Sequence, residues 1–303
     1  MHEMEWLGIR LALVVGVILL VLVGAVFIFL VWATPGERDE SAEPDYGDGY
    51  VSVSAGREHA CGLRRDGSVF CWGENTFGQA ISQDGAFTSV TAGTIHTCGL
   101  RADGRVACWG NDGHGRATPP DGSFRSVSAG GSHTCGVRSD RTLACWGDNG
   151  FGQVSPPDGT FDSVSAGGLH ACAVRANGSV TCWGADDSGQ ADPPYGPFLS
   201  VSAGWKHTCG ITTVGAVVCW GANDRGQARP PTEAFSSVSA AARHTCGISA
   251  DRSIVCWGAY SPGGLTAPPG KFIAVGAAGE YACAVEESSE ITCWGAPPEP
   301  PRR

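Results

Sequence analysis

The hydrophobic and polar residues of this chain follow two different patterns. Residues 11–33 form an apolar run without a charged residue, LALVVGVILLVLVGAVFIFLVWA. As a helix, this run would be about 34 Å long, which is enough to cross the hydrocarbon core of a bilayer. From residue 50 onward, short segments alternate apolar residues with small or polar ones, as half-buried β-strands do. The pattern predicts one transmembrane helix followed by an all-β domain.

The apolar run favours a retained membrane anchor over a cleaved signal peptide. A signal peptide has a hydrophobic region of about 7–15 residues that follows a basic segment. Here 23 uncharged residues follow MHEMEWLGIR, in which Arg10 is the one Lys or Arg beside two Glu. A signal peptide remains the alternative, because Val31-Trp32-Ala33 could serve as a cleavage site.

The β domain consists of seven units of 37 residues. All 14 cysteines belong to two series with this period: Cys61, Cys98, Cys135, Cys172, Cys209, Cys246 and Cys283, then Cys71, Cys108, Cys145, Cys182, Cys219, Cys256 and Cys293. An aromatic residue opens every unit and a Trp follows every second cysteine, from Trp72 to Trp294. A His recurs from His59 to His244 and becomes Tyr281 in the seventh unit. Self-similarity of this kind indicates a repeat architecture.

Each unit is predicted to form three short strands. Residues 124–129 alternate as a first strand, and the next two strands form a hairpin around turns such as Asp66-Gly67 and Asn177-Gly178. The tail N-x-x-G-Q-x-x-P-P is predicted to be a loop, because proline cannot donate a ladder hydrogen bond. Seven such units predict an all-β, seven-bladed β-propeller of three-stranded blades. A linear β-solenoid is the alternative, but the chain shows no end caps.

The cysteines of each hairpin are predicted to form a disulfide. A three-residue turn at residues 65–67 places Cys61 directly opposite Cys71, on the same side as Leu63 and Val69. Directly paired Cβ atoms lie about 4.5–5.5 Å apart, which is close to disulfide geometry. The hairpin supplies too few ligands for zinc, and C-x-x-C redox motifs are absent from the sequence. Buried free thiols remain the alternative.

Seven disulfides favour an oxidising compartment, so the propeller is predicted to be extracytoplasmic and the N-terminus cytoplasmic. The predicted domains are a cytoplasmic segment (1–10), a transmembrane anchor (11–33), an acidic flexible stalk (34–49), the propeller (50–295) and a Pro-rich tail (296–303). Residues 1–49 hold eight of the 30 acidic and two of the 20 basic residues, so residues 50–303 carry a net charge of only −4. No basic face stands out, which argues against nucleic acid as the partner.

Repeated residues are interpreted as packing elements, and no catalytic, metal or cofactor site is predicted. Function is expected where the units differ, at the two positions before the repeated His. These positions should surround one face of the propeller, with Trp205 as a candidate hot spot for binding a protein. The predicted binding face comprises Arg57, Glu58, Thr94, Ile95, Leu169, Trp205, Lys206, Arg243 and Glu280.

The pattern S-A-G-x-x-H-x-C-G-L…G-x-V-x-C-W-G-x-N-x-x-G-Q resembles the repeat of the regulator of chromosome condensation family. The resemblance covers residues 50–295 and implies a seven-bladed propeller. The 37-residue period is similar to that of the propeller-type β-lactamase inhibitor protein, whose blades are three-stranded. The sequence departs from the family in its paired cysteines, its membrane anchor and a last unit without the G-Q tail.

We therefore expect a membrane-anchored, extracytoplasmic propeller that binds a protein partner and is not an enzyme. One alternative, by analogy with the β-lactamase inhibitor, is an inhibitor or regulator of a secreted or cell-wall hydrolase. The family resemblance also implies guanine-nucleotide exchange, but a disulfide-rich outward domain would not meet a cytosolic GTPase.

Overall fold

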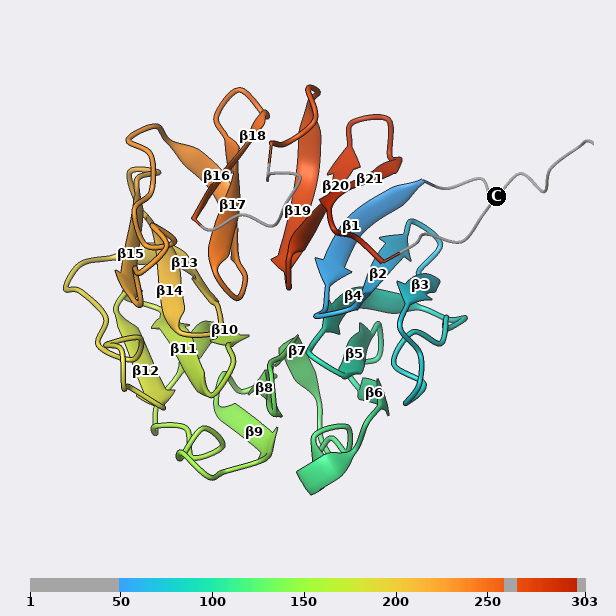
Figure 1. Cartoon of the computed structure of the whole chain (residues 1–303). Coiled ribbons are helices and arrows are strands. Elements are labelled where there is room, and N and C mark those ends of the chain that lie inside the picture. Colours follow the sequence, from blue (N-terminus) through green and yellow to red (C-terminus); the bar gives the residue numbers. More distant parts are fainter. Residues whose placement is uncertain (1–48, 259–265, 299–303) are drawn as a thin grey trace, which may run out of the picture. The chain divides into compact units, whose positions relative to one another are not determined.

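The computed structural model describes residues 49–258 and 266–298. Within these ranges the chain forms seven separate three-stranded antiparallel sheets. Figure 1 shows the sheets as blades that follow one another around a ring in sequence order, with the last blade beside the first. The predicted seven-bladed β-propeller is confirmed, and the linear solenoid is excluded because the first and last repeats are in contact.

Every blade takes its three strands from one unit. The first strands are β1 (Tyr50–Ala55), β4 (Phe87–Ala92), β7 (Phe124–Ala129), β10 (Phe161–Ala166), β13 (Phe198–Ala203), β16 (Phe235–Ala240) and β19 (Phe272–Ala278). The second strands are β2 (His59–Arg64), β5 (His96–Arg101), β8 (His133–Arg138), β11 (His170–Arg175), β14 (His207–Thr212), β17 (His244–Ser249) and β20 (Tyr281–Glu286). The third strands are β3 (Val69–Gly73), β6 (Val106–Gly110), β9 (Leu143–Gly147), β12 (Val180–Gly184), β15 (Val217–Gly221), β18 (Ile254–Gly258) and β21 (Ile291–Gly295).

The first strands of neighbouring blades touch one another all the way around, so they form the inner ring. The ring closes where β1 contacts β19 and β20. No strand is exchanged at this closure, since β1, β2 and β3 make up one sheet and β19, β20 and β21 another. The first and last blades are therefore joined by side-chain packing and hydrogen bonds rather than by a shared sheet.

The predicted hairpin register and all seven disulfides are confirmed. Cys61 lies directly opposite Cys71, and Leu63 opposite Val69. The two Cα atoms of this cysteine pair are 4.0 Å apart. The same pairing recurs in every blade, and no cysteine is free.

The first strand of each blade contains a β-bulge that simple alternation did not predict. In β7 the pairing with β8 shifts between Phe124 and Ser126, so the residue between them has no direct partner. The bulge leaves Arg125 exposed while Phe124 remains buried. The same shift occurs at the second residue of all seven first strands.

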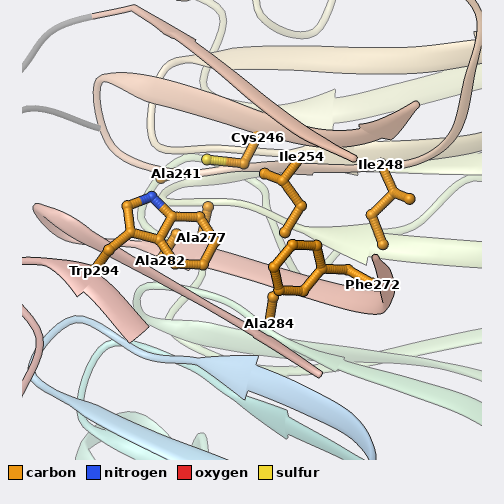
Figure 2. Packing of buried hydrophobic residues seen from close by; sticks show 9 residues of the cluster. All are labelled: Ala241, Cys246, Ile248, Ile254, Phe272, Ala277, Ala282, Ala284 and Trp294. Atoms are coloured by element: carbon orange, nitrogen blue, oxygen red, sulfur yellow. The ribbon is translucent and has the colours of Figure 1, made fainter. Parts of the chain in front are cut away.

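The hydrophobic core lies between neighbouring blades, and the disulfides are part of it. Figure 2 shows Phe272 and Trp294 of the seventh blade packed against Ile248, Ile254 and Cys246 of the sixth. The Cys61–Cys71 disulfide is likewise buried with Leu63 and Val69 against the next blade, where Phe87 and Trp109 meet it. Each blade thus presents a disulfide and aliphatic face to one neighbour and an aromatic face to the other.

Across the described ranges, no helix has the length and apolar character needed to cross a bilayer. The predicted anchor at residues 11–33 lies outside those ranges, so it stays a prediction.

Removal of one disulfide by the double substitution Cys98→Ala and Cys108→Ala should destabilise the propeller. The bridge closes a short loop, which in the chain-entropy model stabilises the folded state by about 2–3 kcal/mol. We expect the urea midpoint of the non-reduced double variant to fall below that of the wild type. An unchanged midpoint, with both wild-type thiols shown to be oxidised, would contradict a stabilising role for this bridge.

Candidate functional site

The loops between the first and second strands surround one mouth of the central channel. This mouth is a depression of about 630 Å³. Every blade contributes to its wall the residue two positions before the repeated His, or before Tyr281 in the seventh blade: Arg57, Thr94, Gly131, Gly168, Trp205, Ala242 and Gly279. One of the two variable positions before the repeated His is therefore gathered around a single opening.

The structure brings six of the nine predicted binding residues together at this mouth. They are Arg57, Glu58, Thr94, Trp205, Arg243 and Glu280. Of the other three, Ile95 and Leu169 are half-buried beside the mouth. The remaining one, Lys206, forms an ion pair with Asp187 in the loop after β12.

Hydrogen bonds between neighbouring blades hold the mouth loops in place. The backbone N–H of Gly168 donates to the carbonyl oxygen of Gly204, and that of Trp205 to Ala241, both at 3.0 Å. The indole of Trp205 lies over Gly168, where a Cβ atom would come within 3.0 Å of the ring. The absence of a side chain at Gly168 thus allows the indole to rest on the neighbouring backbone while 43% of Trp205 stays exposed.

One residue at the mouth was missed by sequence reasoning. Arg225 lies in the tail after β15 and lines the same depression as Trp205. It forms an ion pair with Asp224, with Nε and Oδ2 3.4 Å apart. The sequence did contain a signal, because this repeat position also varies: the first four units have Phe77, His114, Phe151 and Ser188 there. The packing of each tail on the next blade, however, cannot be read from the period.

The repeated histidines are buried between blades, as a packing role requires. In four blades His Nε2 lies 2.8 Å from the hydroxyl oxygen of a Thr in the next blade: His59–Thr97, His96–Thr134, His170–Thr208 and His207–Thr245. Each Thr hydroxyl in turn donates to a carbonyl oxygen of the preceding tail, such as that of Gln79 for Thr97. The hydroxyl must therefore accept from the histidine, which fixes the proton on Nε2.

Two histidines lack this partner because the next blade has Ala where the others have Thr. His133 faces the blade with Ala171, and His244 faces the blade with Ala282. The Nε2 atom of each is buried without a hydrogen bond to the described residues. At the ring closure Tyr281 replaces the histidine, and its hydroxyl lies 2.8 Å from the carbonyl oxygen of Gly56 and 2.6 Å from that of His59.

Burial keeps these imidazoles neutral. It lowers the pKa of His59, His170 and His244 to about 4. It lowers the pKa of the remaining repeated histidines to about 3, namely His96, His133 and His207. No set of three or more His, Cys, Asp or Glu side chains within residues 49–258 and 266–298 could hold a metal ion.

These features define a disulfide-stapled, seven-bladed propeller with one variable channel mouth. The family model of the Regulator of chromosome condensation (RCC1) repeat matches five of the seven units, at residues 50–79, 87–116, 124–153, 161–190 and 198–227. The chain belongs to this family. A comparison with curated protein sequences gave no match.

Solved structures with the same fold include two plant receptor ectodomains and a yeast protein. The CRINKLY WD40 ectodomain of the Arabidopsis thaliana receptor kinase ACR4 has a TM-score of 0.70 and 30% identity, and the match covers 83% of this chain and 96% of that one. The ectodomain of the Physcomitrella patens receptor kinase CR4 has a TM-score of 0.69 and 28% identity, with coverage of 82% and 74%. Prp20p from Saccharomyces cerevisiae, at 14% identity and a TM-score of 0.67, shares the fold over 78% of this chain and 83% of its own.

The substitution Ala171→Thr should stabilise the propeller. The new hydroxyl would accept from His133 Nε2 and donate to the Gln153 carbonyl oxygen, as the equivalent Thr residues do in four other blades. A buried hydrogen bond of this kind contributes about 1 kcal/mol. We expect a higher urea midpoint at pH 7. The matched control is Ala60→Thr, which faces Tyr281 instead of a histidine and should give no gain; equal effects of the two substitutions would contradict the explanation.

The propeller should lose stability as the pH falls from about 6.5 towards 4. The unfolded chain binds protons at histidines of pKa near 6.5, whereas the folded chain does not bind them until about pH 3–4. Between these values each buried histidine lowers the free energy of unfolding by up to about 1.4 kcal/mol per pH unit. The urea midpoint at pH 5 should therefore lie below that at pH 7, and an equal or higher midpoint at pH 5 would refute the prediction.

Proposed function

We propose that this chain is a membrane-anchored, extracytoplasmic propeller that binds a protein partner without catalysing a reaction, and that the channel mouth is the binding site. The observation that carries the proposal is the distribution of sequence variation. The buried His, Trp and Cys positions repeat and pack the blades, whereas a loop position that varies between the units, two residues before the repeated His or Tyr281, lines one depression in all seven.

The disulfides support an extracytoplasmic location, because bridges of this number persist in oxidising compartments. The similarity to two receptor-kinase ectodomains supports the same location and a binding role. Membrane attachment rests on the uncharged run at residues 11–33. The alternative is a secreted propeller whose apolar run is removed as a signal peptide.

The residues at the mouth suit protein recognition. A half-exposed Trp on a rigid support is typical of an interface hot spot, since it buries much area with little loss of conformational entropy. Arg57, Arg243 and Glu280 supply charged groups of both signs around it. The blades fix their positions, so the partner would meet a surface that is already ordered.

Filling the mouth should block the partner. The substitution Ala242→Arg introduces a side chain that blade 1 already has at the same position, as Arg57. We expect a full-length proximity-labelling fusion with this change to label its main extracellular partner on intact cells at least severalfold less than the wild type.

The matched control is Thr88→Arg, which introduces the residue that β7 has as Arg125 at the exposed bulge. This variant should label the partner like the wild type. Equal labelling by the wild type, Ala242→Arg and Thr88→Arg would remove the mouth as the binding site. Retention of the wild-type chain in membranes after an alkaline wash, together with surface biotinylation, would test the anchor and the orientation separately.

A further inference from the structure

One side of the channel mouth combines an indole with two guanidinium groups. Trp205, Arg225 and Arg243 all line the depression, and they come from the fifth and sixth repeats. At the Trp205 position the first blade has Arg57, the second and sixth have Thr94 and Ala242, and the third, fourth and seventh have Gly. The tryptophan and two of the three arginines that line the mouth thus lie at the boundary between the fifth and sixth blades.

Contacts between blades bring these three side chains to the same place. The backbone N–H of Trp205 donates to the carbonyl oxygen of Ala241, two residues before Arg243. The tail that holds Arg225 is fixed to the sixth blade through the Gln227 carbonyl oxygen, which accepts from Trp257 Nε1 at 3.0 Å and from Thr245 Oγ1 at 3.2 Å. Neither attachment involves the side chain of Trp205, Arg225 or Arg243, so substitutions of these three side chains leave both in place.

Where Trp205 lines the mouth, the two arginines Arg225 and Arg243 carry more positive charge than the neighbouring carboxylate of Asp224 neutralises. In the preceding repeat, Lys206 is paired with Asp187. One repeat later the equivalent positions are Arg243 and Asp224, but Asp224 is paired with Arg225. A hydrogen bond from Gln227 lowers the pKa of Asp224, so this carboxylate stays ionised. Among the residues that the structure describes, the two guanidinium groups therefore have one carboxylate between them.

The first and seventh blades bring charges of both signs to the mouth. Glu58 and Glu280 line it, and Glu58 forms an exposed ion pair with Arg57, with Oε1 and Nε 3.3 Å apart. A uniformly anionic polymer would meet these two carboxylates as well as the arginines. A short peptide with its carboxylates at one end matches both sides of the mouth. The volume of about 630 Å³ admits a few side chains rather than a folded domain.

We infer that the channel mouth binds an acidic peptide segment, with a carboxylate held by Arg225 and Arg243 and a neighbouring apolar side chain packed on Trp205. This inference rests on the proposed function and specifies the chemistry of the partner. Guanidinium groups bind carboxylates through paired, charge-assisted hydrogen bonds, which are stronger than neutral ones. The supported indole supplies a rigid apolar surface beside them.

The test measures the binding of labelled peptides to the full chain in lipid nanodiscs by fluorescence anisotropy. The probes are fluorescein-Gly-Ser-Gly-Leu-Glu-Glu-amide and versions with Gln-Gln or Lys-Lys in place of Glu-Glu. Labelled polygalacturonate serves as an anionic polymer that lacks apolar side chains. We expect the Glu-Glu peptide to bind about tenfold more tightly than the Gln-Gln peptide, with an affinity that falls as salt is added.

The variants locate the binding site. Arg243→Gln and Trp205→Ala should each weaken the Glu-Glu peptide by about tenfold, which is the typical effect of losing a charged or aromatic anchor. Arg125→Gln is the matched control, because Arg125 is an exposed arginine in β7 and not part of the mouth. It should change the affinity less than about twofold, within the range expected for surface positions.

Several results would overturn the inference. Equal affinity for the Glu-Glu and Gln-Gln peptides would exclude carboxylate recognition, as would no binding of any peptide. Equal losses in Arg125→Gln and Arg243→Gln would show non-specific attraction. Tighter binding of polygalacturonate that depends on Arg243 would assign the mouth to a polysaccharide. Binding of the Lys-Lys peptide that is lost in Trp205→Ala would refute an acidic partner but not the mouth as a protein-binding site. Whether the mouth binds a protein at all is decided independently by the Ala242→Arg labelling experiment.

Discussion

The packing of one blade's disulfide face against the next blade's aromatic face determines the rest of the structure. A sheet of three short strands has two faces to cover and too little area to form a core by itself. Here the Cys61–Cys71 bridge, Leu63 and Val69 cover the side of the next blade that carries Phe87 and Trp109. Since each blade needs a neighbour on both sides, the chain is stable only as a closed ring.

Much of this fold could be predicted from the sequence because it follows from local periodicity. The step of 37 residues gives the number of blades, and the turn at residues 65–67 fixes the hairpin register and hence the Cys61–Cys71 pair. The bulge after Phe124 was not predicted, because the alternation of residues 124–129 is the same with or without it. Nor was the bond from His59 to Thr97, which depends on how two blades curve against each other.

The candidate site could also be predicted in part from the sequence. Variation between the repeats identified Arg57, Trp205 and Arg243, and the equal spacing of the blades gathered them at one mouth. It did not separate them from Ile95, which occupies the same repeat position as Arg243 but is half-buried and outside the mouth. Arg225 could not be placed because it enters the mouth from a tail, and hydrogen bonds attach this tail to the following repeat.

The ring closure differs chemically from the other six blade contacts. Six blades offer a Ser or Thr hydroxyl to the backbone N–H of an Ala in the next blade, as Ser54 does for Ala92 at 2.9 Å. The seventh has Gly276 instead, and a Cβ there would come within 3.0 Å of the backbone nitrogen of Ala55. Together with Tyr281 in place of the histidine, this tightens the one contact that the chain does not make between consecutive repeats.

Since no strand crosses from one blade to another, the ends of the chain are not needed to hold any sheet together. Each blade is therefore a complete sheet, so the polypeptide could be cut in any tail and its original ends joined. Circular permutation would then preserve all seven sheets and the mouth, while changing the point on the rim at which the chain enters. Gain or loss of a whole repeat would disrupt no sheet here, in contrast to propellers whose last blade is completed by the first strand.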